Sequence, residues 1–164
     1  MKTLLLLRHA RPARVSPTGR DFDRPLAEEG RADALVVGQL LRRRQLRPDP
    51  VICSPALRAL QTADCVIEAA RLSTRLLFYD RIYEASAEQL IEVVSEAAGD
   101  AELILVVGHN PGLQELIFLL TGVSATVTPA TLARIDLDMD AWGKLGAARG
   151  RLVFALSAQA SVGH

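Results

Sequence analysis

The stretch LLLLRHARP, residues 4–12, decides the fold of this 164-residue chain. Four consecutive leucines, followed by a basic segment that contains proline, predict a short and fully buried strand that ends abruptly. Arg8 and His9 then stand at the carboxyl end of that strand. Open α/β sheets bind their ligands at this edge, so we expect both side chains to belong to a functional site.

Two later apolar runs end in a similar way. Residues 103–110 read LILVVGHN and place His109 directly after a strand. Residues 50–55 read PVICSP and lead into a helix that carries Arg58 about one turn from its start. Helical side chains lean toward the amino end of the helix, so Arg58 can reach back over the sheet edge. If the three strand ends are neighbours, one pocket collects four side chains: Arg8, His9, Arg58 and His109.

Strand-like and helix-like segments alternate along most of the chain. Apolar runs predict strands at residues 4–7, 51–53, 76–79 and 103–107, and period-two or apolar patterns in the tail add 131–138 and 152–156. Helical periodicity predicts helices at residues 25–44, 55–70, 86–97 and 111–122. This order predicts an α/β fold, a three-layer α/β/α sandwich with a mainly parallel sheet and at least one antiparallel strand. We expect one domain, residues 1–164.

Three polar residues precede predicted helices. Ser54 and Asn110 each stand before a proline, a pattern typical of an N-cap followed by the first helical residue. Ser86 stands three residues before Gln89, as in a capping box. The free N–H groups at the starts of the helices that follow Ser54 and Asn110 would face the predicted pocket, where they favour an anion.

The composition narrows the class of protein. Hydrophobic residues make up 49% of the chain, and 19 basic and 19 acidic residues give a net charge of +0, so neither nucleic acid nor a membrane is an expected partner. The amino-terminal apolar run is too short for a signal peptide, and no segment approaches a membrane span. Cys53 and Cys65 lack metal-ligand spacing and predict free thiols in a reducing compartment. We therefore expect a cytoplasmic protein.

The predicted pocket suits a tetrahedral dianion. Two arginines, a protonated histidine and helix-end amides can stabilise the equatorial oxygens during phosphoryl transfer, so neither a metal nor a cofactor is expected. The other histidine, unprotonated at its attacking nitrogen, can form a covalent N-phosphoryl intermediate that water hydrolyses. His9 is the better nucleophile because a strand end holds its backbone and because Arg8 disfavours the imidazolium form.

These motifs resemble those of a known family. Residues 8–10 (RHA), 54–63 (SPALRALQTA) and 107–110 (VGHN) are similar to the histidine phosphatase superfamily, also called the phosphoglycerate mutase-like family. Residues 21–26 (DFDRPL) and 82–86 (IYEAS), with the short chain length, resemble its small SixA-type branch of phosphohistidine phosphatases. The resemblance covers nearly the whole chain and implies a phosphoglycerate mutase-like fold. It also implies His9 as the phospho-acceptor, with these residues around the phosphate: Arg8, Arg24, Arg58 and His109.

Two positions depart from the family pattern. Ala10 follows the Arg-His pair where most members have glycine, and the inserted segment that carries a glutamate acid in larger members is missing. Glu84 is then only a positional candidate for the acid. Asn110 is expected to cap its helix beside the phosphate, and we count it as a substrate-binding candidate.

The sequence leaves three functions open. The first is a phosphatase that acts on protein phosphohistidine, favoured because a phosphoramidate leaving group needs less help from an acid and because a site without a lid admits a protein. The second is a phosphatase or mutase for a small phosphorylated metabolite, such as a sugar phosphate or a nucleotide. The third is a phosphate-binding module without turnover.

Overall fold

A computed structural model describes residues 1–162 and shows a six-stranded sheet in the order β3-β2-β4-β1-β5-β6. The strands are β1 (Lys2–Arg8), β2 (Val51–Cys53), β3 (Leu76–Phe78), β4 (Leu103–Gly108), β5 (Thr131–Leu137) and β6 (Gly150–Ser157). Strands β1 to β4 run parallel to one another, whereas β5 pairs antiparallel with both β1 and β6. The predicted mainly parallel sheet with an antiparallel tail is confirmed.

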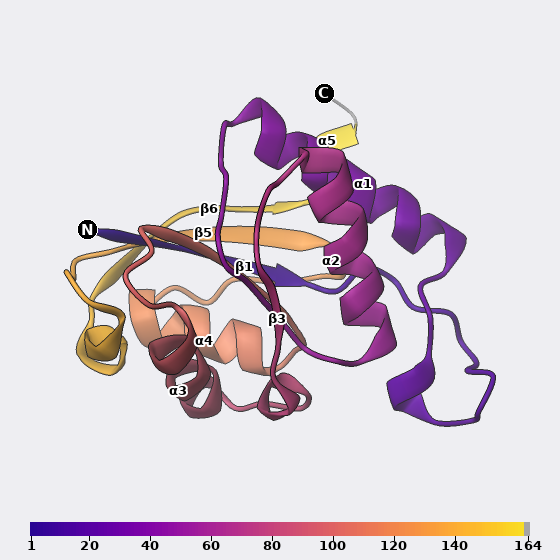
Figure 1. Cartoon of the computed structure of the whole chain (residues 1–164), viewed down its shortest axis with the longest axis horizontal. Coiled ribbons are helices and arrows are strands. Elements are labelled where there is room, and N and C mark those ends of the chain that lie inside the picture. Colours follow the sequence, from indigo (N-terminus) through magenta and orange to yellow (C-terminus); the bar gives the residue numbers. More distant parts are fainter. Residues whose placement is uncertain (163–164) are drawn as a thin grey trace.

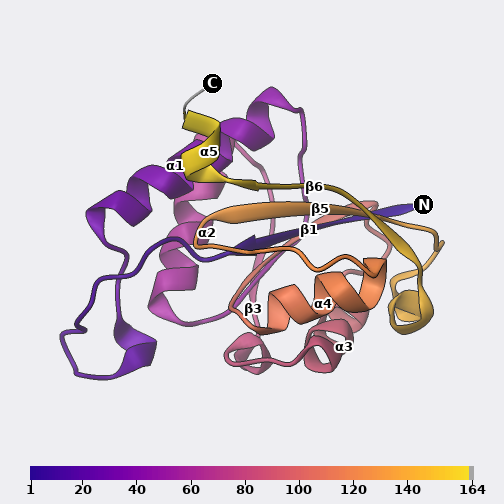
Figure 2. The ribbon, with the colours of Figure 1, turned by 180° about the vertical axis from the view of Figure 1, so that it is seen from behind.

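Helices cover both faces of this sheet. One face packs against α1 (Glu28–Arg43), α2 (Leu57–Ala70) and α5 (Ala158–Val162), and the other against α3 (Ala87–Ala97) and α4 (Gly112–Thr121) (Figure 1). The view from behind shows the same three layers (Figure 2). Short 3-10 turns complete the chain at η1 (Asp21–Asp23), η2 (Asp80–Ile82) and η3 (Trp142–Ala147). The predicted three-layer sandwich is confirmed.

The leucines of β1 divide between two hydrophobic cores. Leu4 and Leu6 point into the core under α3 and α4, whereas Leu5 and Leu7 point into the core under α1 and α2. Successive side chains of a strand face opposite sides, so a continuous leucine run is what a strand buried on both faces requires. All four leucines are at most 1% exposed. The run that opens the chain therefore joins the two helical layers.

The strand register aligns three strand ends at one edge. β4 pairs with β1 so that Arg8 lies opposite Gly108, and with β2 so that Cys53 lies opposite Val107. The residues that follow the three strands therefore begin side by side. The neighbourhood that the sequence analysis assumed for these strands is confirmed by the order β2-β4-β1.

Two predicted helix caps are wrong. Helix α2 begins at Leu57 and α4 at Gly112, and neither receives a side-chain cap. The Ser54 hydroxyl accepts a hydrogen bond from Ala56 N and contacts a histidine, and Asn110 bonds to a loop carbonyl, because both side chains serve the strand edge instead. The capping box of Ser86 at α3 is confirmed.

No helix in residues 1–162 is long and apolar enough to cross a membrane. Cys53 and Cys65 are both free thiols, and Cys53 is buried in β2.

Gly112 provides a test of the packing between α4 and the segment before α3. A Cβ at Gly112 would overlap the carbonyl oxygen of Ala85, whereas a Cβ at Gly143 would have no atom within 4 Å. We expect Gly112→Ala to lower the free energy of unfolding by about 1–3 kcal/mol, measured by urea denaturation. Gly143→Ala should change it by less than about 0.5 kcal/mol. Equal effects of the two substitutions would show that this close approach does not constrain the fold.

Candidate active site

The strand edge brings two histidines together. His9 follows β1 and His109 follows β4, and their ring centroids lie 5.1 Å apart. The side chains are almost enclosed, with 6% of His9 and 9% of His109 exposed. Arg58 is equally buried, and Arg8 is half-buried. The charges of Arg8 and Arg58 act on both imidazoles, so the four residues that the sequence placed in one pocket do gather there.

Hydrogen bonds hold the backbone of His9 from β4 on one side and from Ala130, the residue before β5, on the other. Its N–H donates to the carbonyl of Gly108 over 3.1 Å, and Ala130 N donates to the carbonyls of Arg8 and His9 over 3.1 and 3.2 Å. The ring is oriented as well, because its Nδ1 lies 2.8 Å from the carbonyl oxygen of Ala10. A carbonyl can only accept, so Nδ1 carries the hydrogen. The lone pair of neutral His9 is therefore on Nε2.

Burial keeps both imidazoles neutral in the free protein. Desolvation is the largest cause that lowers the pKa of His9 to about 4, with Arg58, Arg8 and Arg24 adding to it, although the bond to Ala10 opposes the shift. Desolvation, then His9 and Arg58, lower the pKa of His109 to about 3. The protonated histidine expected during phosphoryl transfer is therefore not present in the free protein, where both rings are deeply buried.

The turn of α2 that starts at Arg58 forms hydrogen bonds with the segment after β1 and with the segment before α1. The Thr62 hydroxyl accepts from Ala10 N over 3.0 Å and donates to the carbonyl of Arg58 over 2.7 Å. The Gln61 side chain accepts from Leu26 N over 2.8 Å. The loop between residues 10 and 26 is thus anchored at both ends on the helix that carries the guanidinium. This geometry explains why a polar pair follows Arg58 in the sequence.

Asp21 forms the anionic partner of the arginines. Its carboxylate accepts from Arg58 Nη2 over 3.0 Å, from Arg24 Nη1 over 3.0 Å and from the Tyr83 hydroxyl over 2.8 Å. Arg58 Nη1 also donates to the main-chain oxygen of Asp21. The Tyr83 hydroxyl, followed by Arg24 and Arg58, lowers the pKa of Asp21 to about 2, despite some desolvation. Sequence reasoning missed this role, although an acid three residues before Arg24 is a usable signal.

Tyr83 closes one side of the histidine pair. Its ring meets the His109 ring edge-on at 5.5 Å and the Phe22 ring at 5.2 Å, and the Arg58 guanidinium carbon lies 5.9 Å from its centroid. An aromatic wall therefore links η1 to the segment after η2. This tyrosine lies in the motif at residues 82–86, but no local pattern in the sequence indicates its contact with His109.

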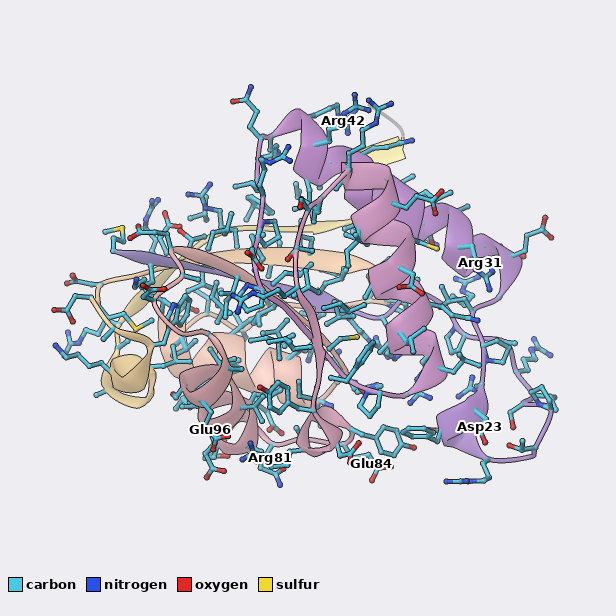
Figure 3. All side chains as sticks on the ribbon, in the orientation of Figure 1. Asp23, Arg31, Arg42, Arg81, Glu84 and Glu96 are labelled. Carbon is cyan, nitrogen blue, oxygen red and sulfur yellow. The ribbon has the colours of Figure 1, made fainter. Side chains whose placement is uncertain are left out.

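The remaining three candidates differ in their surroundings. Arg24 belongs to the cluster through Asp21, and its Nε donates to Ala13 O over 2.9 Å. Asn110 Nδ2 donates to the Val127 carbonyl over 2.7 Å, the same carbonyl that accepts from Arg8 Nη1 over 3.0 Å. Glu84 is exposed at the molecular surface (Figure 3), and the described chain shows no hydrogen bond or ion pair between it and the four central residues.

Buried atoms without partners cluster in the same place. In the part of the chain that the structure describes, three buried side-chain atoms lack a hydrogen-bond partner: Arg8 Nε, His109 Nδ1 and Asn110 Oδ1. All three belong to the two motifs that end β1 and β4. Buried polar atoms are almost always paired, so the two nitrogens, Arg8 Nε and His109 Nδ1, are positioned for a ligand. Guanidinium and imidazole N–H groups suit the oxygens of a tetrahedral anion. Among the described residues, no group of three or more His, Cys, Asp or Glu side chains could hold a metal ion.

Comparison with known proteins defines the class to which this site belongs. The profile of the histidine phosphatase superfamily (branch 1) matches residues 4–87, and the chain belongs to this superfamily. The protein is a phosphatase, and its fold places it with the SixA-type members.

The individual relatives support this assignment. An uncharacterized protein of Mycobacterium tuberculosis is 34% identical over 121 residues, which is 73% of each chain. A protein of Nakamurella multipartitia, described as a candidate phosphohistidine phosphatase SixA, superposes with a TM-score of 0.83 at 28% identity and covers 94% of this chain and 95% of its own. A mycobacterial glucosyl-3-phosphoglycerate phosphatase shares the fold at a TM-score of 0.69 and 18% identity, covering 94% and 98%.

The low pKa values of the histidines predict a pH dependence of stability. The unfolded chain binds protons on these rings near pH 6.5, whereas the folded protein does so only near pH 4 or below. The unfolded chain therefore holds more protons in this window, and the free energy of unfolding should fall as the pH is lowered from about 7 to about 5. Urea denaturation across this range measures the slope. His109→Gln should flatten it, and an unchanged slope would contradict the neutral state.

Removing the charge of Asp21 tests the electrostatics of the cluster. Asp21→Asn leaves an acceptor for Tyr83 but frees the charges of Arg24 and Arg58, so inorganic phosphate should bind severalfold more tightly in calorimetry at low salt. Asp23→Asn is the matched control because that carboxylate bonds to Thr18 on the same loop (Figure 3). Weaker phosphate binding to Asp21→Asn would show instead that Asp21 chiefly orients the arginines.

Proposed function

We propose that this phosphatase acts through a covalent phosphoryl intermediate on His9, without a metal ion, and removes phosphoryl groups from protein phosphohistidine. The observation that carries the proposal is the hydrogen bond from His9 Nδ1 to the Ala10 carbonyl. It leaves Nε2 as the nucleophilic nitrogen of a neutral ring that lies among arginines. We also propose a cytoplasmic setting, which suits the two free thiols.

In the first step, His9 Nε2 attacks the phosphorus atom of the substrate. The new P–N bond forms as the bond from phosphorus to the substrate imidazole breaks, and the departing nitrogen keeps the electron pair. A substrate ring that is protonated on its other nitrogen leaves as neutral imidazole. We assign the stabilisation of the phosphoryl oxygens to Arg8, Arg58 and His109. The Nδ2 group of Asn110 donates to Gln114 Oε1 and to the Val127 carbonyl, so Asn110 borders the pocket without donating to the phosphate.

In the second step, water attacks the phosphoryl group on His9. The P–Nε2 bond breaks, its electron pair returns to the ring, and the proton of the water leaves with the phosphate. His9 is neutral again with its hydrogen on Nδ1, still donated to Ala10. The Ala10 carbonyl thus supports the positive charge that the phosphorylated ring carries between the two steps.

Two observations favour phosphohistidine over a phosphate ester. The fold of a SixA-type protein superposes better than that of the glucosyl-3-phosphoglycerate phosphatase, with TM-scores of 0.83 and 0.69. An ester oxygen needs a proton as it leaves, and Glu84 lies exposed, without contact to the histidine pair. We therefore propose no acid role for Glu84. Arg24, already paired with Asp21, is proposed to contact the substrate at the rim.

The covalent step is tested with a phosphohistidine peptide. We expect His9→Ala to lower phosphate release by at least about 1,000-fold while the circular dichroism spectrum stays unchanged, because the nucleophile is lost. Acid-labile, base-stable phosphoprotein should accumulate on rapid quenching of the wild-type protein and be absent from His9→Ala. EDTA should have no effect. Undiminished release by His9→Ala would overturn the mechanism.

A second arm of this experiment tests the substrate class. The value of kcat/KM for the phosphohistidine peptide is compared with those for glucose 6-phosphate, a nucleoside monophosphate and 3-phosphoglycerate. We expect the peptide to be preferred. A preference for one of the metabolites, with phospho-His9 still formed, would retain the mechanism and replace the substrate.

A further inference from the structure

Ser54 lies against the second histidine. The residue follows β2 directly and is fully buried, and its N–H donates to the carbonyl of Val107 over 3.1 Å. This backbone contact sets its side chain beside the end of β4. Its hydroxyl oxygen lies 2.8 Å from His109 Nε2, and it accepts a second hydrogen bond from Ala56 N over 3.2 Å.

The direction of the bond between Ser54 and His109 follows from the donors and acceptors available. If Nε2 carried the hydrogen, the hydroxyl would accept from both Nε2 and Ala56 N, and the described chain shows no acceptor for its own buried hydrogen. The lone pair on His109 Nδ1 would also remain unpaired. If the hydroxyl donates to Nε2, every hydrogen-bonding group of Ser54 is satisfied. Of the groups of Ser54 and the His109 ring, the Nδ1–H donor alone then lacks a partner among the described residues.

We propose that Ser54 is a positioning residue that holds His109 as the neutral tautomer with its hydrogen on Nδ1, aimed at the oxygen of a bound oxyanion. The site then contacts the anion through a neutral N–H donor as well as through its arginines. A neutral donor does not have to lose a proton when the phosphate leaves. The kinetic part of this inference rests on the proposed function, whereas the tautomer itself does not.

The groups around His109 are consistent with this tautomer. Its ring faces Tyr83 edge-on, and the charges nearby are those of Arg8, Arg58 and Asp21, together with the ring of His9. Two arginines and one carboxylate leave an excess of positive charge, which disfavours an imidazolium at this position. The Nδ1–H donor therefore has no internal carboxylate as a competing partner among the described contacts.

Nitrogen NMR of the wild-type protein tests the tautomer directly. Long-range ¹⁵N–¹H correlation spectra at pH 7.5 should show His109 Nδ1 as the protonated, pyrrole-type nitrogen and Nε2 as the unprotonated, pyridine-type nitrogen. Addition of orthovanadate should shift the Nδ1 resonance. A protonated Nε2, an imidazolium, or a Nδ1 resonance that vanadate does not move would each overturn the proposal, without reference to turnover.

Variants distinguish a positioning role of Ser54 from a contribution to stability alone. Ser54→Ala should populate the other tautomer and lower kcat for the phosphohistidine peptide by about 10-fold or more, with a smaller change in KM, because a contact to the transition state is lost. Ser54→Thr should restore both the tautomer and most of kcat. Ser86→Ala, which removes the helix cap of α3, is the control: it should lower the Tm but leave the tautomer and kcat unchanged.

The outcomes distinguish this inference from the proposed function. A normal tautomer and an unchanged kcat in folded Ser54→Ala would overturn the inference alone. Failure of the wild-type protein to cleave any phosphohistidine would overturn the proposed substrate. The NMR spectra would still decide the tautomer of His109, because that measurement does not depend on turnover. If Ser54→Ala fails to fold, the wild-type spectra decide the question.

Discussion

Parallel pairing of β4 with both β1 and β2 is the constraint on which the site depends. Backbone hydrogen bonds fix this register, and Arg8, Gly108 and Val107 have defined partners in it. The three strands therefore end at one edge, and His9, Ser54 and His109 meet there although they are far apart in the sequence. A slip of one residue would turn the leucines of β1 to the wrong faces, so core burial and site geometry are specified together.

This arrangement buries two imidazoles beside arginines. Desolvation and positive charge lower the pKa values of His9 to about 4 and of His109 to about 3, so both rings of the free protein are neutral at pH 7. Neutrality is what a nitrogen nucleophile requires, because a protonated ring has no lone pair to offer. Asp21 balances Arg24 and Arg58 from the rim, at a position that keeps half of its side chain in water.

The sequence predicted the elements that have strong local signals. Leucine runs, helical periodicity and the capping box of Ser86 are local, and the four central residues follow strands or sit near a helix start. The roles of Asp21, Tyr83 and Ser54 depend on contacts between distant segments, which a single sequence does not encode locally. The same reason explains the two wrong caps: Ser54 matched a local pattern, but its hydroxyl is bonded to a residue 55 positions away.

The loop between residues 10 and 26 is attached to α2 at its two ends, through Thr62 and Gln61, whereas the nucleophile is held by the sheet. The loop that borders the pocket is therefore supported separately from the nucleophile. A change of length within this loop leaves the backbone support of His9 in place, whereas a change at Asp21 or Arg24 alters the charge around Arg58. Access to the pocket and the charge at its rim can therefore be altered through the loop while the nucleophile keeps its place on the sheet.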